Sequence, residues 1–162
     1  MGRPQGILRI VVAVVVMASW SVAAEAGGRH AGYYYPPPAS KEVYTARSAI
    51  LPEADRKLRI AFVTGITNQL AARHYPPTAA IFAKGEHAEK LIIIALEDGR
   101  IDTLFRARAI FANMTAAARV MPLFKQRGVE SWFTFFDLAK MLGFEKVTIS
   151  DGRDFAHQVM FE

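Results

Sequence analysis

Residues 146–161 read KVTISDGRDFAHQVMF, two alternating apolar runs separated by a short polar stretch. Val147 and Ile149 share one side of the first run, because successive side chains of a strand point to opposite faces. The second run places four side chains on one side: Phe155, His157, Val159 and Phe161. Residues 151–154, Asp-Gly-Arg-Asp, are typical of a turn. The stretch therefore predicts a β-hairpin, from which the rest of the fold can be built outward.

The turn of this hairpin is also the densest group of reactive side chains. Asp151, Arg153 and Asp154 lie within four residues and are candidate ligand-binding residues, for an anion or a metal ion. The alternative is a solvated turn that binds nothing. His157 shares a strand face with three large apolar side chains, so we expect it to be packed and hydrogen bonded in the core or at its edge.

A second hairpin is predicted earlier in the chain. Two apolar runs, TAAIFAK (78–84) and KLIIIALE (90–97), flank the short polar segment 85–89. Both faces of the second run are apolar, which indicates an interior strand covered on both sides. Glu86, His87 and Glu89 in the turn could ligate a metal ion, but a solvated turn explains them better, and we expect no metal site.

The segment before that hairpin permits two interpretations. Pro52 is suited to a first helical position, and an apolar stripe recurs every four residues, at Leu58, Phe62, Ile66 and Leu70. This predicts a helix over residues 52–73. Alternatively, LRIAFVTG (58–65) is a buried strand and TGITNQLA (64–71) a phosphate-binding turn into a helix. The lone Gly65 matches neither of the usual glycine-rich nucleotide loops.

Two further helices are predicted after the second hairpin. Residues 102–121 carry apolar side chains spaced alternately by three and four, at Leu104, Ala107, Phe111, Met114, Ala118 and Met121. Arg108 and Arg119, eleven residues apart, lie on one face and are candidates for holding an anion between them, against a simple solvated face. Thr134 and Asp137 form a capping box for a short helix, 135–142, and Gly143 supplies its stop.

These elements predict an α+β fold with one small domain. An antiparallel sheet of two hairpins is covered by about three helices. The aromatic side chains around the short helix are expected in the core: Trp132, Phe133, Phe135 and Phe136. The alternative is an exposed aromatic patch for a partner.

The N-terminal residues predict export. Arg3 and Arg9 precede a short apolar run, residues 10–22, and small residues follow up to Ala26. This pattern is typical of a secretory signal peptide, residues 1–26. The alternative is an uncleaved anchor. Residues 27–42, rich in Gly, Pro and Tyr, then predict a linker, with a Tyr-Pro docking motif as the alternative, and residues 43–162 form the domain.

Composition excludes several kinds of chemistry. The chain has no cysteine, so thiol nucleophiles, disulfides and thiolate metal sites are absent. No Gly-x-Ser-x-Gly is present, and the four histidines lack metal-binding spacing. Without Arg3, Arg9 and Glu25, the 20 basic and 15 acidic residues become 18 and 14. That small, dispersed excess predicts no nucleic-acid partner, and we expect no stable membrane span after cleavage.

Three stretches resemble a known family: residues 42–94 (EVYTARSAILPEADRKLRIAFVTGITNQLAARHYPPTAAIFAKGEHAEKLIII), 133–144 (FTFFDLAKMLGF) and 150–159 (SDGRDFAHQV). They are similar to small exported proteobacterial proteins often labelled molybdopterin-guanine dinucleotide biosynthesis protein A. That label implies Mg²⁺-dependent guanylyl transfer from GTP to molybdenum cofactor. The glycine-rich, arginine-bearing loop of such enzymes has one candidate counterpart here, TGITNQLA, and the resemblance assigns no catalytic residue.

Two functional hypotheses follow from the sequence. We expect an exported, periplasmic binding or accessory protein without catalytic activity, whose partner, a protein or small molecule, and whose cofactors the sequence does not identify. The alternative is a molybdenum-cofactor-related nucleotidyltransferase. The structure of residues 58–70 distinguishes the two hypotheses. A strand, loop and helix would support the nucleotidyltransferase, and one continuous helix would favour the binding protein.

Overall fold

The computed structural model describes residues 35–162, except 73, 98, 120–127 and 129–130. The expected signal peptide and residues 27–34 of the expected linker lie outside the described residues. Among the described residues, no helix is both long enough and apolar enough to cross a membrane.

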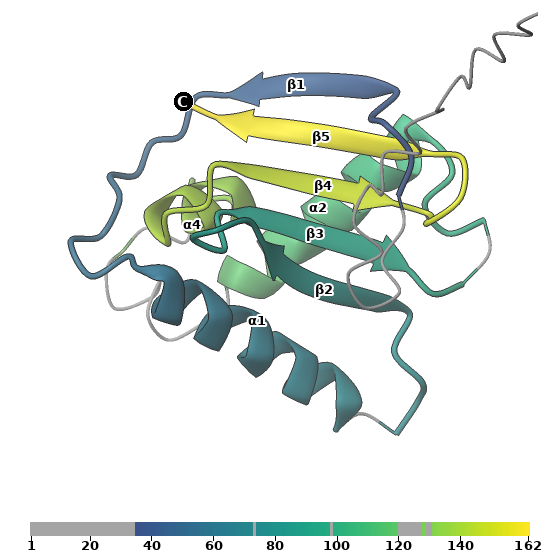
Figure 1. Cartoon of the computed structure of the whole chain (residues 1–162), viewed down its shortest axis with the longest axis horizontal. Coiled ribbons are helices and arrows are strands. Elements are labelled where there is room, and N and C mark those ends of the chain that lie inside the picture. Colours follow the sequence, from purple (N-terminus) through teal and green to yellow (C-terminus); the bar gives the residue numbers. More distant parts are fainter. Residues whose placement is uncertain (1–34, 73, 98, 120–127, 129–130) are drawn as a thin grey trace, which may run out of the picture.

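Five strands form one sheet in the order β1-β5-β4-β3-β2 (Figure 1). Their bounds are β1 Ser40–Tyr44, β2 Ala79–Lys84, β3 Lys90–Ala95, β4 Lys146–Ser150 and β5 Ala156–Phe161. The two expected hairpins, β2–β3 and β4–β5, are both present and antiparallel. The α+β class and the single small domain are therefore confirmed.

The sheet is mixed, whereas the sequence predicted an antiparallel one. The hairpins join through β3 and β4, which run parallel, and β1 adds in parallel to β5. The first difference has a topological cause: the connection between β3 and β4, whose described part includes the helices Leu104–Arg119 and Phe135–Met141, is a crossover, and a crossover returns the next strand in the same direction. The second difference is that β1 was not expected at all. The strand begins at Ser40, so the sheet includes the last residues of the expected linker.

Among the described residues, three helices accompany the sheet: α1 Arg56–Ala71, α2 Leu104–Arg119 and α4 Phe135–Met141. Figure 1 shows α2 and α4 behind the strands and α1 alongside β2. We call the side of the sheet turned away from α2 and α4 the distal face. Side-chain alternation assigns the odd-numbered positions of β3 and β4, such as Leu91 and Ile149, to the helix side and the even-numbered positions to the distal face.

The α1 helix decides between the two interpretations of residues 58–70. It is continuous through Gly65, so a strand at 58–65 followed by a phosphate-binding turn is excluded. The expected start at Pro52 is wrong, because the helix begins at Arg56. Asp55 is the N-cap and accepts a hydrogen bond from the backbone N–H of Leu58 at 2.7 Å, which satisfies one of the free amide groups of the first turn.

The other two helices agree with their sequence patterns. In α2, the buried residues Ala107, Phe111 and Ala118 follow the predicted seam. In α4, the capping box is complete: Thr134 accepts from the backbone N–H of Asp137, whose carboxylate accepts from the backbone N–H of Thr134. Gly143 ends the helix at a φ of 80°, a left-handed conformation that favours glycine.

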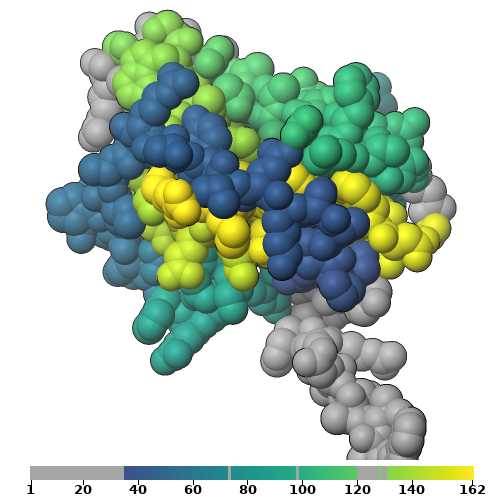
Figure 2. Space-filling view, turned by 90° about the horizontal axis from the view of Figure 1, so that it is seen from above, coloured from purple at the N-terminus to yellow at the C-terminus, as the bar shows by residue number. Residues whose placement is uncertain are grey.

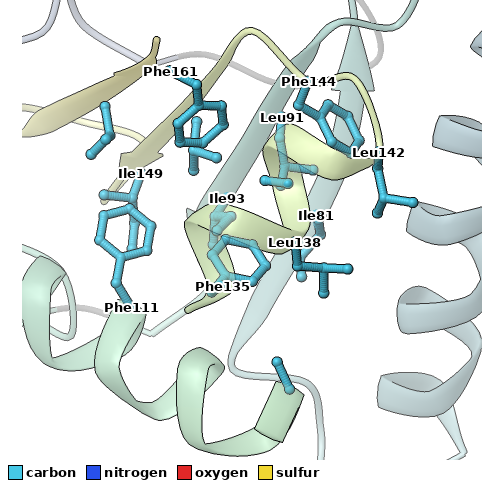
Figure 3. Packing of buried hydrophobic residues seen from close by; sticks show 14 of the residues in the cluster. Ile81, Leu91, Ile93, Phe111, Phe135, Leu138, Leu142, Phe144, Ile149 and Phe161 are labelled. Atoms are coloured by element: carbon cyan, nitrogen blue, oxygen red, sulfur yellow. The ribbon is translucent and has the colours of Figure 1, made fainter. Parts of the chain in front are cut away.

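The core lies between the sheet and the helices (Figure 3). Leu91, Ile93 and Ile149 from the central strands are at most 1% exposed. Figure 3 shows Phe111 of α2 and Phe135 of α4 pointing toward these strand residues. The rings of Phe111 and Phe135 stack with centroids 6.4 Å apart. This apolar layer, built without disulfides, holds the domain together.

Candidate functional site

The turn at residues 151–154 is stabilised by its own side chains. Asp151 Oδ1 accepts hydrogen bonds from the backbone N–H groups of Arg153, Asp154 and Phe155 at 2.8, 3.0 and 3.0 Å. Ser150 Oγ donates to the carbonyl of Phe155 at 2.6 Å. Gly152 adopts a φ of 77°, as its place in the turn predicts. One carboxylate oxygen of the candidate site is therefore already committed to the backbone.

The two candidate arginines of α2 have separate partners. Arg108 forms an ion pair with Glu42 of β1, and its side chain is 60% exposed. Arg119 donates from Nε to the carbonyl of Phe133 at 2.9 Å, just before α4. The eleven residues between them span about 16 Å of helix. The structure thus directs these two side chains to different neighbours and does not bring them together around one anion.

Arg108 instead belongs to a cluster at the β1–β5 edge of the sheet. The parallel pairing sets Ser40 beside His157 and Glu42 beside Val159. Ser40 Oγ and His157 Nδ1 share a hydrogen bond of 2.8 Å. The other imidazole nitrogen, Nε2, lies 3.8 Å from Oε2 of Glu42. We call Ser40, Glu42, Arg108 and His157 the edge cluster.

The His157 imidazole is buried beneath α2. Its side chain is 0% exposed, and its ring lies 6.3 Å from that of Phe111. Its Nε2 has no hydrogen-bond partner among the described residues. Burial lowers the pKa of His157, an effect that Glu42 opposes and Arg108 reinforces. The imidazole is therefore neutral at pH 7, and the expectation of a packed, hydrogen-bonded histidine is confirmed.

The order of groups in the edge cluster, hydroxyl, imidazole and carboxylate, is that of a nucleophilic relay. Two observations argue against this use. The Nε2-to-carboxylate distance of 3.8 Å exceeds a hydrogen bond, and Arg108 engages the carboxylate from the solvent side. The imidazole is also closed off from solvent. The arrangement is instead suited to holding β1 against β5 and α2.

The chain matches no family model, no curated protein and no solved structure. The chemistry of its side chains is therefore the basis on which its function must be judged.

Glu89 in the β2–β3 turn also forms bonds within the protein. The Glu89 carboxylate accepts from the backbone N–H of His87 at 3.0 Å and lies 3.5 Å from Nζ of Lys90. Burial acts to raise the pKa of Glu89, but the N–H donors and the Lys90 ammonium outweigh it and lower that pKa below its usual range. Within the described part of the chain, no three side chains of metal-ligating type come together.

Two buried polar residues have structural roles that the sequence only partly indicated. Asp137, fully buried, accepts from the Tyr44 hydroxyl at 3.1 Å and from the backbone N–H of Arg47 at 2.8 Å. Arg59, 7% exposed, has no sequence signal of its own. Its guanidinium donates to four backbone carbonyl groups, those of Ala54, His87, Leu142 and Gly143. These bonds connect α1 to the β2–β3 turn and to the end of α4.

Ser40 and Glu42 were missed by sequence reasoning. The alternation in SKEVY is the one signal that could have found them, since it places Ser40, Glu42 and Tyr44 on the same side of a strand. Nothing in that pentapeptide indicates a partner strand far along the chain.

Proposed function

We propose that this chain is an exported binding or accessory protein of the periplasm that performs no chemistry of its own. The observation that carries the proposal is the continuous α1 helix, Arg56–Ala71. It occupies the segment from which the competing nucleotide site would have been built. Elsewhere, the reactive side chains of Asp151 in the 151–154 turn and of Ser40, Glu42, Arg108 and His157 in the edge cluster form internal bonds or ion pairs that stabilise the fold.

Export is supported by the sequence of residues 1–26. A basic start, a short apolar run and small residues before Gly27 together form the pattern that signal peptidases recognise. The domain itself fits this location, since it has no cysteine to oxidise and is stabilised by an apolar core.

The alternative function is guanylyl transfer to molybdenum cofactor, which rests on the family resemblance. That reaction requires donors that cradle the phosphates of GTP and carboxylates that hold Mg²⁺. With Gly65 inside α1, the alternative lacks the glycine turn that was its one sequence feature. Binding of GTP is therefore the property that separates the two hypotheses.

Export is tested by recovering the protein from its native host and measuring its mass. We expect the protein in the periplasmic fraction, with a new N-terminus near Gly27. An intact Met1 in the cytoplasmic fraction would contradict the proposal. Co-purification from the same periplasmic fraction would then identify what the protein binds.

A further inference from the structure

The middle of the distal face is closed to solvent. An uncovered sheet face leaves its side chains in contact with water. Six positions of β3, β4 and β5 on this face are nevertheless at most 8% exposed: Ile92, Ile94, Thr148, Ser150, Ala156 and Gln158. We call these six residues the distal strip. Their burial means that some part of the protein covers them.

The described helices do not provide this cover. Val63 of α1, Phe111 of α2 and Leu138 of α4 all belong to the core cluster on the other side of the sheet. Ile92 and Ile94 are buried, yet they lie outside that cluster. The cover of the distal strip is therefore separate from the helix layer.

The chain that leads into β1 starts at the distal strip. The backbone N–H of Ala39 donates to the carbonyl of Ala156, a member of the strip, at 2.9 Å. Figure 1 shows the residues before β1, in dark blue, turning from the start of β1 across the ends of β5 and β4. In Figure 2, which looks down on the β1 edge, dark blue atoms lie on the side opposite the green helices. Tyr35 and Pro36, where the described chain begins, are half-buried.

The residues just before Tyr35 are long enough to cross the strip. Residues 27–34 span up to about 26 Å when extended, at about 3.3 Å per residue. Neighbouring strands are about 4.8 Å apart, so a path from β5 over β4 to β3 is only about 10 Å long. By contrast, residues 120–130 connect α2 to α4, two helices that pack on the other side of the sheet.

The composition of residues 27–34, GGRHAGYY, suits the distal strip. Glycine and alanine allow the backbone to approach the sheet closely, and the two tyrosines supply large rings. The strip combines apolar Ile92 and Ile94 on β3 with polar Thr148 and Gln158, which share a hydrogen bond of 3.2 Å. Tyrosine fits such a boundary because its ring is apolar and its hydroxyl is polar.

We propose that residues 27–34 form a cover that packs on the distal strip, with the rings of Tyr33 and Tyr34 against Ile92 and Ile94. The segment that the sequence indicates as a linker is then part of the fold, and the N-terminus left by signal cleavage lies against the sheet. The inference goes beyond the proposed function. It does not rest on export, because these residues are present with or without the first 26.

The test is the labelling of single cysteines with a maleimide, which the cysteine-free chain allows. Thr148→Cys places a thiol in the distal strip, and Val147→Cys places one in the core at the next residue of β4. Each is labelled in the wild-type background and in the variant Tyr33→Ser/Tyr34→Ser. Loss of the two rings should speed labelling of Thr148→Cys at least about ten-fold, because they supply most of the contact that keeps the cover closed. Labelling of Val147→Cys should stay equally slow in both backgrounds.

Tyr75→Ser is the control for loss of a tyrosine elsewhere, since Tyr75 is 78% exposed. It should leave the labelling of both thiols unchanged. Ile94→Cys repeats the measurement at a second position of the strip and replaces Thr148→Cys if that variant does not fold.

Four results would overturn the inference. Fast labelling of Thr148→Cys with both tyrosines present would mean that the strip is open. Slow labelling that the tyrosine variant does not change would mean that something else covers it. Labelling that accelerates on dilution would assign the cover to a second copy of the chain. Equal acceleration at Val147→Cys would show that the tyrosines stabilise the whole domain and do not act at this face.

Discussion

Ser40 Oγ lies 2.8 Å from Nδ1 of His157, although 117 residues separate the two in the sequence. This contact joins the edge strand β1 to β5, on the side that α2 covers. It gives the buried imidazole the hydrogen bond that such a group requires.

Replacing Ser40 by alanine should destabilise the protein by about 1–2 kcal/mol, because His157 is left buried without its hydrogen bond. Lys41→Gln is the matched control, since Lys41 lies in the same strand on the distal face, and its effect should stay within about 0.5 kcal/mol. Chemical denaturation of the three proteins at pH 7 measures this. Equal stability of Ser40→Ala and the wild type would show that the bond does not hold β1.

Stability should fall as the pH drops below about 6.5. Burial lowers the pKa of His157 from the ordinary value of 6.5, so the folded protein keeps the imidazole neutral where the unfolded chain takes up a proton. Above pH 6.5 neither state binds this proton, and the group has no effect on stability. Below it, the wild type should lose up to about 1.4 kcal/mol per pH unit until the folded-state pKa is reached.

The variant His157→Gln isolates this contribution. It should be less stable than the wild type at pH 7, but its stability should decline less between pH 6.5 and about pH 5. Denaturation curves collected at several pH values give both slopes. Parallel slopes for the two proteins would mean that His157 is protonated equally in the folded and unfolded states.

The turn at residues 151–154 should tolerate changes at its tip but not at its glycine. Gly152→Val should cost about 1–2 kcal/mol, because valine is strained at a φ of 77°. Asp151→Asn should cost less, since the amide oxygen can still accept from the backbone. Arg153→Ala should change the free energy of unfolding by at most about 0.5 kcal/mol. Thermal melts rank the three variants, and a large loss for Arg153→Ala alone would reverse this account of the turn.

Gly65→Ala should stabilise the protein. Gly65 lies inside α1, and a Cβ built there has no atom within 4 Å. Alanine in an exposed helical position is favoured over glycine by about 0.5–1 kcal/mol. Denaturant titration of the two proteins tests this, and a destabilised variant would indicate that residue 65 adopts a conformation other than helix.

Local patterns predicted much of the fold. The alternation around 146–161 identified the last hairpin, and the Thr134–Asp137 box located the start of α4 to the residue. The pairing of β1 could not be predicted, because five residues of SKEVY contain no information about a partner 117 positions away. Missing β1 accounts for one of the two parallel pairings, whereas the other, between β3 and β4, follows from the crossover that connects them.

The candidate surfaces were harder to predict than the elements. Arg108 was identified for its spacing from Arg119, yet its partner is Glu42, which a strand pairing brings to α2. Side chains that meet through long-range pairing leave no local signal.

The central claim is that this is a binding protein with no nucleotide chemistry, and calorimetric titration with GTP and Mg²⁺ tests it most directly. The wild type and Gly65→Ala are titrated side by side under the same conditions. We predict no binding heat beyond dilution for either protein. Micromolar GTP binding by the wild type that is lost in the more stable Gly65→Ala variant would contradict the claim and establish a nucleotide site at α1.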